Sequence, residues 1–212
     1  GLSSTTAAGT SYVVTPSAAT GAGGFLASNY NITYTAFNGT VSQKALTITA
    51  NNTTKPYGTT QSTPVSGSTA FTSSGLVGSE TIGSVTLTYG SGALTATAAV
   101  GSTSSITPGT ATGGTFTASN YSITYVSGTL TVGANSITIT ATGPSKTYGT
   151  ALSTGTSATN FTVTGTLASG ETITSVTLTP NAAGLSSTTA AGTSYVGTPS
   201  AATGAGGFLA SN

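Results

Sequence analysis

The residues with the most chemical potential in this sequence are its few charged ones, and they recur at a fixed spacing. Lys55 and Lys146 lie 91 residues apart, and so do Glu80 and Glu171. The chain has three lysines and two glutamates, and charged residues make up 2% of it. The simplest interpretation is one lysine–glutamate ion pair per repeat, or two separate solvated charges. An exposed pair contributes about 0–1 kcal/mol to stability.

A reactive alternative includes an asparagine. Asn120, which is equivalent to Asn29 and Asn212, follows the lysine and the glutamate in chain order. This order resembles the triad of self-forming isopeptide bonds in bacterial pilins and adhesins, where a neutral lysine attacks an asparagine amide beside a protonated glutamate. Burial shifts both pKa values in the direction that this chemistry needs. The crosslink and the ion pair both stay open as hypotheses. For Asn120, the alternative hypothesis is a turn residue that satisfies local backbone groups. The crosslink hypothesis concerns Lys55, Glu80, Asn120, Lys146, Glu171 and Asn212.

Most other site chemistry is excluded by the residue types that the sequence lacks. Without cysteine, histidine or aspartate there is no disulfide, no thiolate nucleophile, and little from which to build a metal site or a general base. A net charge of +1 gives no electrostatic footprint for nucleic acid. No apolar run approaches the roughly 18 residues of a membrane span. We therefore predict no catalytic residue, no metal, no cofactor and no enzyme activity.

Six asparagines begin an Asn-x-Ser/Thr sequence, the acceptor for N-glycosylation. In a chain this rich in threonine, serine and asparagine, several such sequences arise by chance. These possible glycosylation sites are Asn31, Asn38, Asn51, Asn52, Asn120 and Asn160.

Internal repeats organise the chain. LTITANNTTKPYGT at residues 46–59 returns as ITITATGPSKTYGT at 137–150, and FLASNYNITY at 25–34 returns as FTASNYSITY at 116–125, both after 91 residues. The last 29 residues repeat the first 29 with one difference, Val14 against Gly197. The repeats divide the chain into three parts: 1–44 as the end of a preceding module, 45–135 as a complete module, and 136–212 as a module lacking its last strands.

This division suggests that the chain is a window on a longer polymer of repeats. Covalent continuation would supply the missing strands without redundancy. Strand exchange between separate chains is the alternative, and it would leave the duplicated 29 residues redundant.

Each module is expected to be all-β. Segments such as ALTITA and NYSITYV alternate β-branched or aromatic residues with small polar ones, the pattern of half-buried strands. Asn38-Gly39 and Ser127-Gly128 lie between two such runs and predict hairpin turns. We expect tandem elongated β-sandwich-like modules of about 91 residues, Ig-like or β-grasp-like, with no significant helix.

Aromatic residues are the expected anchors of the core, since there is no tryptophan. Tyr57 and Tyr148, in the two YG turns, are expected to cap the end of a module. The remaining anchors are expected at Phe25, Phe116, Tyr30, Tyr121, Tyr34 and Tyr125.

The paired landmarks resemble a known family. KPYGT and KTYGT, the closing SNYNITY and SNYSITYVSGTLTV, and the loops LVGSET and LASGET are similar to the motifs of the bacterial MBG domain of the YGX type. Such domains occur in tandem in very large secreted or surface-anchored proteins. The resemblance implies an extracellular or cell-surface location, and it supplies no binding residue.

Two functions follow as hypotheses. The first is a structural repeat segment of a long extracellular fibre, stalk or filament on a bacterial surface, with adjacent repeats or identical chains as partners. The second is an adhesin module that displays loops to glycans or surfaces, and a glycan would then be the ligand.

Overall fold

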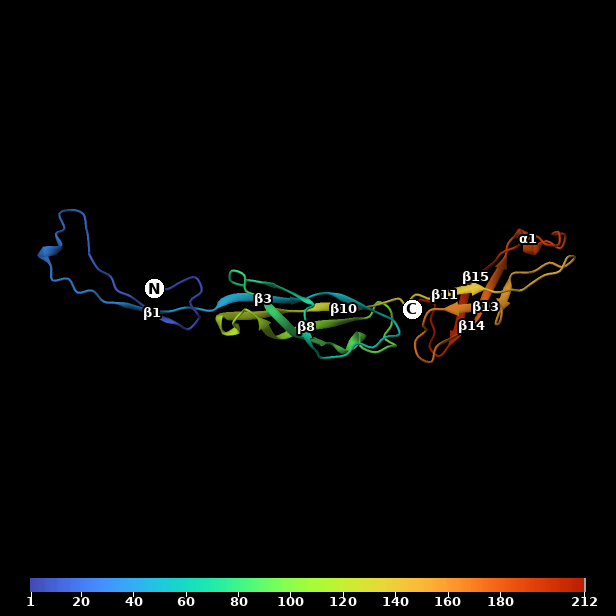
Figure 1. Ribbon diagram of the computed structural model, residues 1–212, viewed down its shortest axis with the longest axis horizontal. Helices are drawn as coiled ribbons and strands as arrows, with labels where there is room; N and C mark the ends of the chain where they lie inside the picture. Colours follow the sequence, from blue (N-terminus) through green and yellow to red (C-terminus); the bar gives the residue numbers. More distant parts are fainter. Residues whose placement is uncertain (212) are drawn as a thin grey trace. The chain divides into compact units, whose positions relative to one another are not determined.

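The computed structural model describes residues 1–211, and its regular secondary structure is mostly β-strand (Figure 1). Its helical content is one four-residue helix, α1 (Ala182–Leu185), and short 3-10 turns such as η1 (Ala27–Asn29) and η3 (Ala118–Asn120). The all-β prediction is confirmed. By their internal contacts the residues form two compact units, and the boundary between the units runs through the 45–135 segment. The module borders taken from the repeats stay a prediction.

Unit 1 comprises Gly1–Asn51, Pro64–Thr88 and Thr107–Gly128. Its central strand, β3, is antiparallel to β6 on one edge and parallel to β9 on the other. β5, β7 and the second part of β8 are hydrogen-bonded in that order, and β1 pairs with β2. These strands are β1 (Ser11–Val14), β2 (Phe37–Thr40), β3 (Lys44–Ala50), β5 (Val65–Ser68), β6 (Phe71–Ser74), β7 (Ile82–Tyr89), β8 (Thr103–Gly114) and β9 (Tyr121–Val126).

The alternating pattern of β3 explains the core of unit 1. Leu46, Ile48 and Ala50 are buried, and the threonines between them are half-buried. A β-strand directs successive side chains to opposite faces, so an every-second-residue apolar pattern puts one complete face into the core. Val85 and Leu87 of β7 are buried by the same rule.

Unit 2 comprises Asn52–Thr63, Tyr89–Ile106 and Thr129–Asn212. β4 and β10 are parallel, and β10 neighbours the first part of β8. Two further sheets have the orders β11-β13 and β12-β14-β15, and both contain antiparallel pairs. The strands are β4 (Thr53–Pro56), β10 (Gly128–Gly133), β11 (Thr138–Ala141), β12 (Gly155–Ser157), β13 (Phe161–Thr164), β14 (Thr172–Pro180) and β15 (Gly197–Ala205).

The sequence repeat has a structural counterpart in the β3–β6 and β11–β13 pairs. Thr47 lies opposite Ser74, and Thr138 lies opposite Thr164. Each pair ends at a glycine with positive φ, Gly75 at 113° and Gly165 at 102°. The two pairs therefore have the same register.

Both hairpin predictions are wrong. Asn38 and Gly39 lie inside β2, where Gly39 is opposite Tyr12 of β1. A Cβ on Gly39 would lie 2.4 Å from the Tyr12 ring, so the glycine is explained by a close ring contact. Ser127 and Gly128 connect β9 to β10, and these strands belong to different sheets.

The expected aromatic anchors are only partly buried. Tyr57 and Tyr121 are buried, and Phe25 and Phe116 are half-buried. The prediction is wrong for the side chains that are exposed. These side chains are Tyr30, Tyr34, Tyr125 and Tyr148.

Candidate functional site

The lysines of the repeat are held by backbone carbonyls. Lys55, on β4, is 5% exposed, and its Nζ donates to the carbonyl oxygens of Thr59 at 2.7 Å and Thr95 at 2.9 Å. Burial lowers the pKa of Lys55 because it removes water from the charged form. This ammonium group therefore ties the YG turn to the 89–106 segment of unit 2.

Lys146 repeats this arrangement. Its Nζ donates to the carbonyl oxygens of Ala183, at 3.1 Å, and of Ser186. Ser186 lies 91 residues after Thr95, so the lysine–carbonyl contact recurs with the sequence repeat. Both lysines act as local crosslinks of the backbone through hydrogen bonds.

Each glutamate is bound by a tyrosine hydroxyl. In unit 1, the Tyr121 hydroxyl donates to Glu80 and accepts a hydrogen bond from the Val77 amide at 3.0 Å. Burial, and next the hydrogen bond to Glu80, raise the pKa of Tyr121 above its ordinary value. The ring of Phe116 lies 6.3 Å from that of Tyr121, so the tyrosine closes this end of the core.

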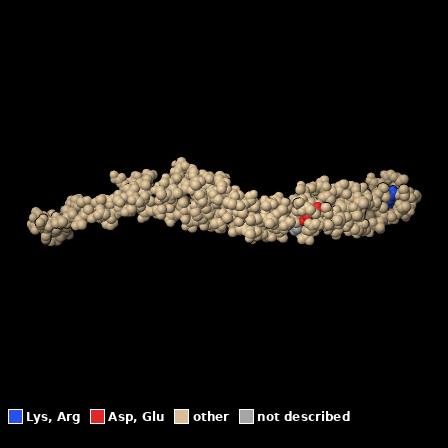
Figure 2. All heavy atoms as spheres, turned by 90° about the horizontal axis from the view of Figure 1, so that it is seen from below, with Lys and Arg blue, Asp and Glu red and all other residues tan. Residues whose placement is uncertain are grey.

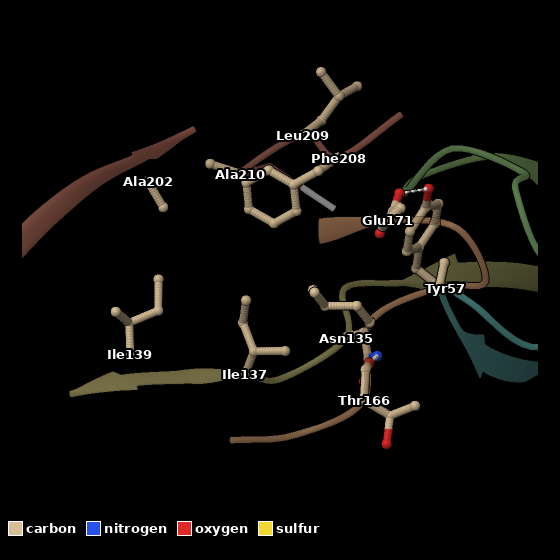
Figure 3. Close-up of a pocket in the computed structure, with 12 residues that line it drawn as sticks. Tyr57, Asn135, Ile137, Ile139, Thr166, Glu171, Ala202, Phe208, Leu209 and Ala210 are labelled. Atoms are coloured by element: carbon tan, nitrogen blue, oxygen red, sulfur yellow. Dashed lines mark hydrogen bonds between the residues drawn. The ribbon is translucent and has the colours of Figure 1, made fainter. Parts of the chain in front are cut away.

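In unit 2 the corresponding carboxylate binds a different tyrosine (Figure 3). The Tyr57 hydroxyl donates to Oε1 of Glu171 at 2.5 Å. Tyr57 is 6% exposed, and its neighbour Gly58 lies close to Ala168, in the loop that carries Glu171. Tyr57 belongs to the predicted 45–135 module and Glu171 to the predicted module after it, so by these predicted borders the contact would join two successive modules.

The predicted triad residues therefore have separate partners. Asn120 is half-buried, and its Oδ1 accepts a hydrogen bond from the Ala8 amide at 3.0 Å. Asn212 lies outside the described residues. The crosslink and the ion pair stay predictions. The face drawn in Figure 2 carries only small spots of charge.

The six possible glycosylation sites differ in exposure. Asn31, Asn38, Asn51 and Asn52 are exposed, and the amide oxygen of Asn52 accepts from Thr129 at 2.8 Å. Asn120 and Asn160 are half-buried. Glycosylation stays a prediction at each site.

A cavity of about 300 Å³ lies beside the Tyr57–Glu171 contact (Figure 3). Its apolar lining includes Ile137, Ile139 of β11 and Phe208, and Asn135 lies at its rim. No pattern in the sequence by itself pointed to this cavity or to the tyrosine–glutamate contacts. The signal for the contacts was available, since both residue types recur with the repeat, but their pairing depends on the fold.

One family model matches the chain: residues 46–131 match the MBG domain (YGX type). This stretch is therefore one MBG domain, a non-catalytic module typical of bacterial surface repeat proteins. No curated protein and no solved structure matches the chain. Among residues 1–211, no helix is long and apolar enough to span a membrane.

Proposed function

We propose that this chain is a structural repeat segment of a long extracellular fibre, stalk or filament on a bacterial surface. The observation that carries the proposal is the Tyr57–Glu171 contact in unit 2, which by the predicted borders would join one module to the next. Tyr148, the equivalent of Tyr57, is 69% exposed. A further repeat that supplied the equivalents of Ala168 and Glu171 would cover Tyr148 in the same way.

The composition supports a structural role. A chain with 2% charged residues and no histidine or cysteine offers few groups for catalysis or ion binding. Its charged side chains are instead used in local contacts, lysines with carbonyls and glutamates with tyrosine hydroxyls. Such contacts stiffen a module without a disulfide.

Electron microscopy of the native assembly tests this function. We expect a filament whose axial repeat equals one or two modules. A dispersed protein without filaments, together with specific binding to a glycan array, would contradict the proposal and favour the adhesin module.

An isopeptide crosslink remains a separate proposal for the same chain. Each bond between Lys55 and Asn120, or between Lys146 and Asn212, would remove one ammonia from the intact mass. An unshifted mass would exclude it. The carbonyl contacts of both lysines support the hydrogen-bonded role instead.

A further inference from the structure

Among the described residues, β11 is paired along one edge only. It pairs with β13, and no strand of residues 1–211 pairs along its other edge. β3, its equivalent in unit 1, carries β6 on the corresponding edge and the parallel strand β9 on the opposite one. Backbone donors and acceptors on an open strand edge are a template for one more strand.

The side chains next to this edge differ in burial between the two repeats. Leu46 and Ile48 of β3 are 1% and 0% exposed. Their equivalents Ile137 and Ile139 are half-buried and line the cavity with Phe208. The cavity and the unpaired edge of β11 beside it together form a groove. An unpaired strand edge with apolar side chains next to it can bind an added β-strand that has apolar residues on one face.

The chain itself contains a segment whose sequence matches β9. YNITY at residues 30–34 differs from YSITY at 121–125, the sequence of β9, at one position. Residues 31–36 belong to no strand, and Tyr30 and Tyr34 are 62% and 39% exposed. In its own chain, the Tyr30 ring stacks on Phe25 with centroids 5.4 Å apart.

We propose that the β11 edge binds residues 30–35 of a second copy of this chain as a parallel strand. β9 fixes the register, because Tyr121 lies opposite Lys44 and Ile123 opposite Leu46. Moved by one repeat, this register places Tyr30 of the second copy opposite Asn135, Ile32 opposite Ile137 and Tyr34 opposite Ile139. The three apolar side chains of the strand then cover the cavity.

Glu171, at the polar end of the groove, also matches the added strand. Tyr121 donates to Glu80 and lies beside Phe116, and the equivalent positions in the groove are Glu171 and Phe208. The incoming Tyr30 would donate to Glu171. A carboxylate accepts several hydrogen bonds, so Tyr57 and Tyr30 can bind Glu171 together.

Neither partner carries the charges that usually prevent edge pairing. Residues 28–41 and β11 contain no lysine or glutamate. Natural edge strands are commonly protected by such charges. Head-to-tail association of copies is the consequence, and it does not depend on the proposed surface role.

Disulfide trapping tests the register, since the chain has no cysteine of its own. Asn31 and Ser136 are exposed and lie opposite each other in the proposed pair. We would mix two chains of different tag mass, one Asn31→Cys and the other Ser136→Cys, under mild oxidation and measure the mixed disulfide dimer by mass spectrometry. Neighbouring strands lie about 4.8 Å apart, within the range that a disulfide spans.

The matched control replaces Ser136→Cys by Thr138→Cys. That pair is displaced by two residues and lies about 8 Å apart, too far for a disulfide. We expect at least about tenfold more mixed dimer for Ser136→Cys. Equal yields, or no dimer from either mixture, overturn the proposal and leave the edge to a segment of the same polypeptide.

A second pair of variants separates strand pairing from non-specific association. Ile32→Asp, on the face of the strand toward the cavity, should abolish the trapped dimer, whereas Thr33→Asp on the other face should retain it. Equal effects of the two variants would contradict strand addition.

Discussion

At the scale of single residues, charge in this protein serves local structure. Lys55 and Lys146 bind main-chain carbonyls, and each glutamate binds a tyrosine hydroxyl. These contacts lie in buried or half-buried surroundings, where a hydrogen bond to a charged group is stronger than in water. These charged side chains therefore hold local contacts in the fold rather than surface ion pairs.

Replacing Tyr121 by phenylalanine tests the hydroxyl contact. Tyr121→Phe removes the donor to Glu80 and the acceptor for Val77 and keeps the ring. We expect a loss of about 1–3 kcal/mol in the free energy of unfolding, measured by denaturant titration. Tyr148→Phe, at a 69% exposed ring, is the control and should change it by less than about 0.5 kcal/mol.

Replacing Lys55 by methionine tests the ammonium group. Lys55→Met keeps most of the buried stem but removes the donor to Thr59 and Thr95. We expect a destabilisation of about 1–3 kcal/mol, observed as a lower midpoint of chemical unfolding. Lys44→Met changes an exposed lysine in the same way and should be nearly neutral. Equal effects of both variants would argue against a structural role for Lys55.

At the scale of elements, the repeated β pairs decide where a strand can be added. β3 lies between two strands, whereas β11 has one partner among the described residues. The sequences of the two strands are similar, so the difference comes from the environment. Where β9 pairs with β3, apolar side chains are buried, and where β11 has β13 as its single partner among residues 1–211, they line a cavity.

Hydrogen exchange should report this difference. Backbone amides of β3 should exchange at least about tenfold more slowly than those of β11, because exchange from an edge strand needs only local opening. The measurement is native-state exchange followed by mass spectrometry on peptides from 44–50 and 137–143. Equal protection at low protein concentration would show that the β11 edge is already covered.

Gly75 marks the end of the β3–β6 pair. Its φ is 113°, and a Cβ there would lie 2.4 Å from the carbonyl oxygen of Ala45. Gly75→Ala should therefore destabilise the protein by more than about 2 kcal/mol, since both the backbone and the contact are unfavourable. Gly109→Ala, with no heavy atom within 4 Å of the added Cβ, is the matched control in thermal unfolding.

At the scale of the whole molecule, low charge makes stability insensitive to solution conditions. Five charged side chains in 212 residues leave few long-range interactions for salt to screen. Two groups have shifted pKa values. Tyr121 has a pKa raised from 10.0, and Lys55 has one lowered from 10.5.

The two shifts predict opposite changes at high pH. The folded state holds the Tyr121 proton more tightly than the unfolded state, so this stabilisation is present below pH 10.0 and is lost as pH rises through the raised pKa. The folded state holds the Lys55 proton less tightly, so its destabilisation disappears as pH rises toward 10.5. Denaturant titration at a series of pH values measures both changes. Tyr121→Phe should remove the alkaline loss, and Lys55→Met should remove the alkaline gain.

Sequence alone determined the repeat, the all-β class and the MBG resemblance of residues 46–131. Periodicity and composition are local properties, and local properties suffice for these conclusions. The hairpin prediction at Gly39 and the core prediction for the exposed tyrosines were wrong, because a close ring contact and the burial of a side chain depend on neighbours in space. Only the tertiary structure decided that Glu80 binds Tyr121 and that Glu171 binds Tyr57. It also decided that Ile137 and Ile139 line a cavity, whereas the equivalent Leu46 and Ile48 are buried. The physical reason is that equivalent side chains acquire different roles when different strands lie beside them.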